Sequence, residues 1–243
     1  MKFSLHSFCS FIWGLLFISP CCFAQRLPTH LELMSAGPSA DNIRAQIGAT
    51  SIDVLEYDLG DLNGDGLDEF VAAIETPVII EDARERLVVI FEKQEGRWIL
   101  LKSSASPILN SEEGGIMGDP FEGLGIHDKE LHISHYGGSN WRWWMQDTYG
   151  YDGVDFVLIN HQSYWGSLCD EKIEWEINLK EGTATCQYAL EECPEGFGNN
   201  GHLDSIPVSE TFDISKANRI ILAQRRDTII TFVSPKHGFE TSL

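Results

Sequence analysis

The alternation of apolar and polar residues after Thr50 predicts a chain made almost entirely of β-strands. Short runs with apolar residues at every second position are separated by turns rich in Gly, Asn and Asp. Consecutive runs of this kind are typical of an antiparallel meander of hairpins. The sequence therefore predicts the all-β class, arranged either as propeller-like blades or as a sandwich. Strands are expected at 52–57, 69–75, 86–92, 97–103, 124–127, 130–135, 140–148, 155–162, 172–179, 183–190, 219–223 and 228–233.

One segment, 31–47, has apolar residues at helical rather than strand spacing. Gly37 and Pro38 interrupt it, because neither residue favours a helix interior. We therefore expect a short N-terminal helical segment.

The first 24 residues predict export from the cytoplasm. Lys2 gives a positive start, the apolar run 11–18 is too short to span a bilayer, and Ala24 is a small residue at the cleavage position. Cys21 and Cys22 leave lipidation open as an alternative, although the proline before them is unusual in a lipobox. We expect 1–24 to be a signal peptide and the mature protein to be periplasmic or secreted.

Removal of 1–24 leaves 25–243, roughly 220 residues, which is enough for a single all-β domain with a sizeable core. The Gly-rich stretch near 107–121 is a possible internal boundary, and 193–207 is a second long loop. The formal net charge of −20 disfavours nucleic acid and anionic membranes as partners. No later segment reaches the roughly 20 apolar residues of a membrane span, so we expect no membrane insertion after signal removal.

The runs 172–179 and 183–190 both alternate and predict a hairpin that turns at 181–182. Matching their apolar faces places Ile177 opposite Cys186. Cys186 then points into the core as a small hydrophobic residue.

Three cysteines remain after export, and an oxidising compartment favours one disulfide and one free thiol. Extension of the same hairpin ladder brings Cys193 close to Cys169. We therefore predict a Cys169–Cys193 disulfide at the base of the hairpin.

The run DLNGDGLDEF, residues 61–70, places oxygen-bearing side chains at alternate positions around two glycines. Ca²⁺ takes six to eight oxygen ligands, and a tight loop supplies them from alternate residues plus one backbone carbonyl. The sequence therefore predicts a Ca²⁺ site with the ligands Asp61, Asn63, Asp65, the Leu67 carbonyl and Glu69.

The flanks of this loop exclude an EF-hand, because strands replace its helices and Ala72 stands where the bidentate acid should be. The loop instead resembles the calcium loop of FG-GAP and VCBS-type repeats, in which a DxNxDGxxD/E turn joins two strands of a propeller blade. The resemblance covers 57–71 and implies that the same residues hold the ion. We expect the ion to be structural, since it neutralises packed carboxylates and adds binding free energy to folding.

Three tryptophans occur within four residues of the strand expected at 140–148. Strand alternation places Trp141 and Trp143 on one face, and Arg142 and Trp144 on the other. One face is expected to be core, and the other could bind a sugar or a protein, since Trp and Arg favour such sites. The alternative is an aromatic strand buried between two sheets. The candidate partner-binding residues are Tyr136, Arg142 and Trp144.

The stretch 114–123 and the run YGGSNWRW at 136–143 are similar to uncharacterised exported bacterial proteins that carry the same calcium loop. The similarity covers 58–159. It implies no particular activity.

Other residues that could support catalysis are isolated. His132 and His135 lie on opposite faces of a strand, which makes them poor co-ligands of one metal. Asp119 and Glu122 are a possible carboxylate pair for glycoside hydrolysis. The chain has no nucleophile elbow, P-loop, dinucleotide fingerprint or zinc-protease helix.

These features favour a secreted or periplasmic, calcium-stabilised binding protein without catalytic activity, whose partner is an unknown protein or glycan. One alternative is a periplasmic inhibitor or immunity protein against a toxin or hydrolase, because an acidic surface steers a basic partner. A second alternative is a cell-wall or carbohydrate hydrolase that uses Asp119, Glu122 or the histidines.

Overall fold

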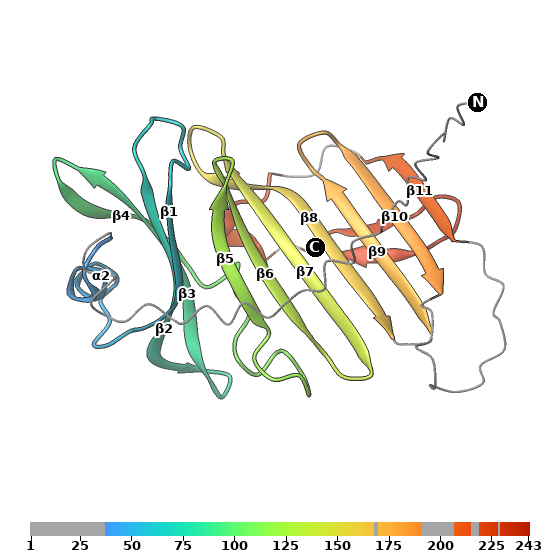
Figure 1. Ribbon diagram of the computed structural model, residues 1–243, viewed down its shortest axis with the longest axis horizontal. Coiled ribbons are helices and arrows are strands. Elements are labelled where there is room, and N and C mark those ends of the chain that lie inside the picture. Colours follow the sequence, from blue (N-terminus) through green and yellow to red (C-terminus); the bar gives the residue numbers. More distant parts are fainter. Residues whose placement is uncertain (1–36, 168–169, 191–206, 215–218, 228) are drawn as a thin grey trace, which may run out of the picture.

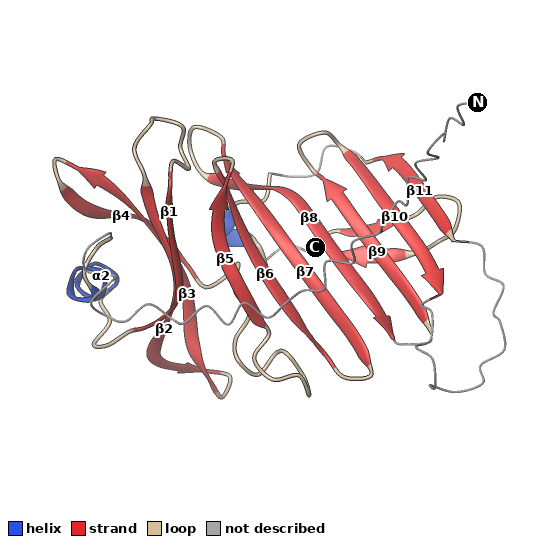
Figure 2. Cartoon of the chain, in the orientation of Figure 1, coloured by secondary structure: helices blue, strands red, loops and turns tan. Residues whose placement is uncertain are grey.

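The computed structural model describes residues 37–167, 170–190, 207–214, 219–227 and 229–243. Within these residues the chain forms two large antiparallel sheets and one small one, so the prediction of an all-β fold is confirmed (Figures 1 and 2). The predicted signal peptide and both cysteines of the predicted disulfide lie outside the described residues.

The first sheet is an up-and-down meander in the order β1-β2-β3-β4. A short helix, α2 (Ala40–Ile47), packs beside β4 and begins two residues after Pro38. The Ser39 hydroxyl caps it by accepting a hydrogen bond from the Asn42 N–H, and Gly48 ends it with φ 74°. The strands are β1 (Asp53–Gly60), β2 (Glu69–Ile80), β3 (Ala83–Gln94) and β4 (Arg97–Ser104).

The second sheet has seven strands in the order β11-β10-β9-β8-β7-β6-β5. Strands β1 to β10 and β12 overlap the expected ranges, whereas β11 and β13 were not predicted. The strands are β5 (Phe121–His127), β6 (Glu130–Gly138), β7 (Trp141–Tyr151), β8 (Phe156–Ser167), β9 (Glu171–Asn178), β10 (Thr183–Leu190) and β11 (Val208–Asp213).

The C-terminal tail packs on one face of the seven-stranded sheet and corrects one prediction. The strand expected at 219–223 is absent: Ile221 makes a single bridge to Val157, and the chain then turns into the 3-10 helix η1 (Leu222–Gln224). One bridge does not extend a strand, because Leu222 turns inward to the core. The tail ends in the two-stranded sheet β12 (Thr231–Val233) and β13 (Glu240–Ser242).

The β9–β10 hairpin forms as predicted, but its register differs by two residues. Cys186 lies opposite Trp175, not Ile177, because the connection has four residues, 179–182, rather than two. Asn178 stabilises this longer turn, since its side-chain oxygen accepts the Glu181 N–H. A shift of two residues keeps every side chain on its face. Cys186 is therefore still buried as predicted, and burial, with Glu210 nearby, raises the pKa of its free thiol to about 11.

A single hydrophobic cluster joins the two large sheets. It includes Val71 and Ile90 of the first sheet together with Ile133, Tyr149 and Ile177 of the second. We call the face of the seven-stranded sheet that meets this cluster and the C-terminal tail the inner face, and the opposite one the outer face.

Side chains of β1 close the edge of the seven-stranded sheet. The carboxylate of Glu56 accepts the Leu124 N–H at 3.0 Å, and that of Asp58 accepts the Ile126 N–H at 2.7 Å. These contacts satisfy donors of the edge strand β5, which would otherwise be free to pair with another chain. They also bring the β1–β2 loop close to the β5–β6 turn.

Candidate functional site

The predicted calcium loop connects β1 to β2. It contains four of the five expected ligand residues, and the fifth, Glu69, is the first residue of β2. Gly64 and Gly66 have φ of 82° and 88°, a conformation that side chains disfavour, and they allow the chain to coil tightly here. Local hydrogen bonds hold the coil, because the Asp61 carboxylate accepts the Gly64 N–H at 2.7 Å and that of Asp65 accepts the Leu67 N–H at 2.8 Å.

Glu69 is the most enclosed acid of the loop, with 1% of its surface exposed. Its Oε2 accepts the backbone N–H groups of Leu62 at 2.8 Å and Asn63 at 3.2 Å. Burial raises the pKa of Glu69, and the negative charges of Asp65 and Asp61 raise it further. The loop therefore holds three carboxylates together at an electrostatic cost.

Two groups reduce that cost. The Asn63 amide donates through Nδ2 to Glu69 Oε1 at 2.8 Å and to Asp65 Oδ2 at 3.3 Å. The ammonium of Lys129, in the β5–β6 turn, lies 3.1 Å from Asp61 Oδ2. Although slight burial opposes it, Lys129 and the loop N–H groups lower the pKa of Asp61.

The donor set of the loop fits Ca²⁺ chemically, because it consists of carboxylate, amide and carbonyl oxygens. The ligands are not arranged in a coordination geometry for a metal ion. Within the described residues, no group of three or more His, Cys, Asp or Glu side chains is placed to hold a metal. The Asn63 amide points its nitrogen, not its oxygen, at the carboxylates. A bound cation would require this amide to turn over.

The candidate partner-binding residues share the outer face of the seven-stranded sheet. Tyr136 of β6 lies directly opposite Trp144 of β7, and Arg142 follows two positions away on the same face. Burial alternates in β6, where Ile133 and His135 are buried and Tyr136 is only partly so. Trp144 is half-buried and Arg142 is exposed.

The aromatic row continues onto β8, where Tyr164 lies opposite Trp144. The Tyr164 ring lies along its strand over Gly166, because a Cβ added there would be 2.6 Å from the tyrosine oxygen. Strand alternation in 155–162 could have indicated this face, but the strand was expected to end before Tyr164. The same cross-strand row continues through Glu174 and Gln187.

A hollow of about 310 Å³ lies beside this row. Trp144 and Tyr164 supply its aromatic wall. Its polar wall comes from Gln162, Glu174, Glu176, Thr185 and Gln187. Within the described part of the chain the amides of Gln162 and Gln187 make no side-chain hydrogen bond, so they are available to a ligand.

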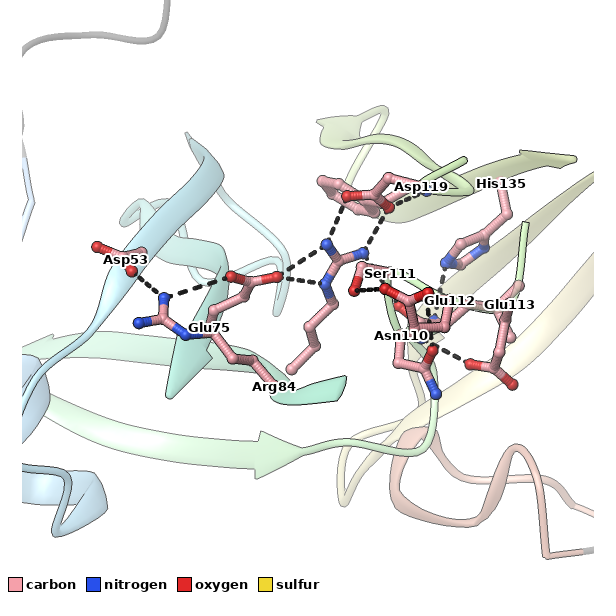
Figure 3. A network of polar contacts seen from close by, with 12 residues as sticks. Asp53, Glu75, Arg84, Asn110, Ser111, Glu112, Glu113, Asp119 and His135 are labelled. Atoms are coloured by element: carbon pink, nitrogen blue, oxygen red, sulfur yellow. Dashed lines mark hydrogen bonds and ion pairs between the residues drawn. The ribbon is translucent and has the colours of Figure 1, made fainter. Parts of the chain in front are cut away.

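The carboxylate pair considered for hydrolysis is not arranged as one. Asp119 is ion-paired with the Arg86 guanidinium, which also binds Glu75 at 2.8 Å. Figure 3 shows Glu75 and Asp119 in the same network of polar contacts. Although burial opposes it, Arg86 holds the pKa of Asp119 below its usual range. Glu122 is exposed. Asp119 therefore joins the first sheet to the loop 105–120.

The two histidines lie on opposite faces of β6, as their spacing predicted. His135 is buried on the inner face, where its Nε2 accepts the Leu109 N–H at 3.1 Å. His132 is on the outer face, with its Nδ1 3.2 Å from both Gln146 Nε2 and Thr148 Oγ1. They cannot act together on one ligand.

Sequence reasoning missed a buried polar network on the inner face. Asp147 Oδ1 lies 2.7 Å from His161 Nδ1, Asp147 Oδ2 accepts a bond from Arg225 Nε at 2.5 Å, and the Tyr149 hydroxyl donates to the same oxygen at 3.3 Å. These residues come from β7, β8 and the C-terminal tail. No local motif connects them, so the sequence offered no signal.

Comparison of the chain with protein-family models, with curated proteins and with solved structures found no match. In the part of the chain that the structure describes, no helix is long and apolar enough to cross a membrane.

Proposed function

We propose that this is an exported, calcium-stabilised binding protein without catalytic activity, and that it binds a glycan on the outer face of the seven-stranded sheet. The observation that carries the proposal is the cross-strand row Tyr136–Trp144–Tyr164, which continues into polar side chains. The signal-peptide pattern of 1–24 supports export.

The chemistry of the outer face suits a sugar. The C–H faces of a sugar ring pack on aromatic rings, while its hydroxyls need both donors and acceptors. Trp144 and Tyr164 offer the rings, and Gln162, Gln187 and Glu174 offer the hydrogen-bonding groups. A hollow with an aromatic wall and a few convergent polar groups is the usual form of a small-ligand site.

The calcium part of the proposal assigns the ion to the β1–β2 loop. The loop's resemblance to FG-GAP and VCBS-type repeats and its three crowded carboxylates support this assignment. An ion there stabilises the corner where β1 meets the β5–β6 turn, since Lys129 of that turn already contacts Asp61. The glycan face lies elsewhere, so the ion is structural.

The binding test uses the mature protein and a panel of immobilised polysaccharides and peptidoglycan-derived oligosaccharides. We expect retention by at least one glycan, and an affinity at least tenfold lower for Trp144→Ala, since aromatic residues dominate such contacts. Trp165→Ala is the matched control, because Trp165 is exposed on the inner face of the same sheet. No retention by any glycan, or an equal loss in both variants, would contradict the proposal.

A further inference from the structure

A second hollow, of about 420 Å³, lies on the inner face, behind the strands that carry the proposed glycan face. It is bounded by β7, β8 and β9 and by the C-terminal strand β13. Its walls are mainly apolar and include the side chains of Trp143, Met145, Trp165 and Ile173. Its polar groups are His161, Ser163 and the β13 residues Glu240, Thr241 and Ser242.

The aromatic walls of this hollow are flat surfaces. The Trp143 ring lies against the backbone of Gly137, because a Cβ added there would be only 2.5 Å from the ring. Trp165 stacks on Trp141 with ring centroids 4.1 Å apart and planes 12° apart. Trp165 nevertheless keeps 41% of its surface exposed. The hydrophobic core therefore leaves a large aromatic area uncovered here.

His161 is held in a single orientation at the hollow. It is 2% exposed, and its Nδ1 lies 2.7 Å from Asp147 Oδ1. Burial alone would raise the pKa of Asp147, but His161 and Arg225 bring it down to about 2, so the carboxylate is ionised. Because an ionised carboxylate only accepts, Nδ1 carries the proton of the ring.

The other ring nitrogen of His161 is then a hydrogen-bond acceptor in the neutral ring. Among the described residues, none makes a hydrogen bond to this Nε2, and Ser163 is not bonded to it either. Ser163 is therefore not placed as a nucleophile that His161 could activate. A buried acceptor without a protein partner, at a mainly apolar hollow, is instead typical of a site that orients a ligand.

We infer that the inner hollow binds a small aromatic molecule that carries an O–H or N–H donor. Its ring packs on Trp143 and Trp165, and its donor bonds to His161 Nε2. Asp147 acts as a positioning residue, since it fixes the proton and the orientation of His161. The inference goes beyond the proposed glycan binding, because it concerns the opposite face of the sheet and different side chains.

Phenol and toluene test this inference, because they have nearly the same shape and only phenol carries a donor. We expect titration calorimetry and ligand-observed NMR on the mature protein to show at least tenfold tighter binding of phenol than of toluene. Loss of a hydrogen bond to a buried polar group is the reason for the difference. Equal affinities, or binding of neither molecule, would overturn the inference.

Three variants locate the site. Trp165→Ala removes an exposed wall and should weaken phenol binding at least tenfold. Tyr136→Ala changes an aromatic residue of the outer face that does not line this hollow, and it should leave phenol binding unchanged. His161→Gln should reduce the preference of the protein for phenol over toluene. If this variant does not fold, the comparison of Trp165→Ala with its outer-face control still tests the location of the site. Phenol binding that persists in Trp165→Ala overturns the inference. Failure of glycan binding leaves these results unaffected, since the glycan test depends on Trp144.

Discussion

Among the described residues, the carboxylate cluster around Asp147 and the one in the β1–β2 loop are built in opposite ways. Asp147 is buried among a histidine, an arginine and a tyrosine hydroxyl, so its charge is matched inside the fold. The β1–β2 loop packs Asp61, Asp65 and Glu69 together with a single ammonium, that of Lys129, at one edge. The negative charge of the first cluster is balanced, whereas the second has one ammonium beside three carboxylates.

The pKa values follow this difference. His161 and Arg225 outweigh burial and lower the pKa of Asp147 to about 2, whereas burial and its acidic neighbours raise that of Glu69. Both residues are carboxylic acids, so the charge of the neighbouring groups decides whether the pKa is raised or lowered. A buried carboxylate with a raised pKa beside other carboxylates is an arrangement that a cation would relieve, which is why it supports the proposed Ca²⁺ site.

The complete cluster should be the most sensitive to the loss of a partner. In Arg225→Met, Asp147 keeps its burial but loses its guanidinium, and breaking a buried ion pair typically costs about 3–5 kcal/mol. We expect a loss of this size in the free energy of unfolding, measured by urea denaturation at pH 7. Arg219→Met is the matched control, because Arg219 pairs with Asp152 at the surface, and it should change little. Similar losses in both variants would show that burial of the Asp147 cluster does not increase the contribution of its ion pair to stability.

A buried histidine without a carboxylate partner extends the comparison to pH. Burial, only partly offset by Asp147, lowers the pKa of His135 to about 4, below the ordinary value of 6.5. Above pH 6.5 neither the folded nor the unfolded state carries this proton. As the pH falls from 6.5 to about 4, the unfolded state takes up the proton and the folded state does not, so stability is lost.

The expected loss is up to about 3 kcal/mol, at 1.36 kcal/mol for each unit of pKa difference. The measurement is the urea midpoint of the protein at intervals between pH 7 and pH 4. His135→Gln keeps an acceptor for the Leu109 N–H and should show a flatter profile in this window. Asp147 does not interfere, since its contribution is lost only at lower pH, toward its pKa of about 2. Identical slopes in the protein and the variant would exclude His135 as the cause.

The same contrast explains what the sequence could predict. All five expected ligands of the loop lie within nine residues, so spacing alone places them together, and alternation was enough to place Trp144 and Cys186 on their faces. Asp147, His161 and Arg225 meet only because the tail folds back on the sheet, a long-range contact with no local pattern. For the same reason the strand predicted at 219–223 is absent, and the sequence pattern did not predict β11 and β13.

The smallest expected effect concerns the β1–β2 loop, where one ammonium lies beside three carboxylates. If Ca²⁺ binds there, it should stabilise the protein by about 2.7 kcal/mol when its concentration is 100 times Kd, and a chelator should reverse this. Thermal unfolding with Ca²⁺ and with EDTA measures the effect. Asp65→Ala should abolish the response, whereas Asp68→Asn, an exposed loop residue outside the expected ligand set, should retain it. Absence of any shift at millimolar Ca²⁺ would exclude the site.

Glu69→Gln separates two effects of the Glu69 carboxylate: the electrostatic cost in the calcium-free protein and the gain in stability when Ca²⁺ binds. The folded-state pKa of Glu69 lies above its unfolded value, so its ionised form at pH 7 weakens the calcium-free fold, and that cost disappears as the pH falls through the folded pKa. In EDTA at pH 7 the variant should therefore be at least as stable as the original protein, and the two should converge toward pH 4.5. With Ca²⁺ the order should reverse, because only the original protein gains the ion. A variant that is much less stable than the original in EDTA would mean that Glu69 serves mainly to accept the N–H groups of Leu62 and Asn63.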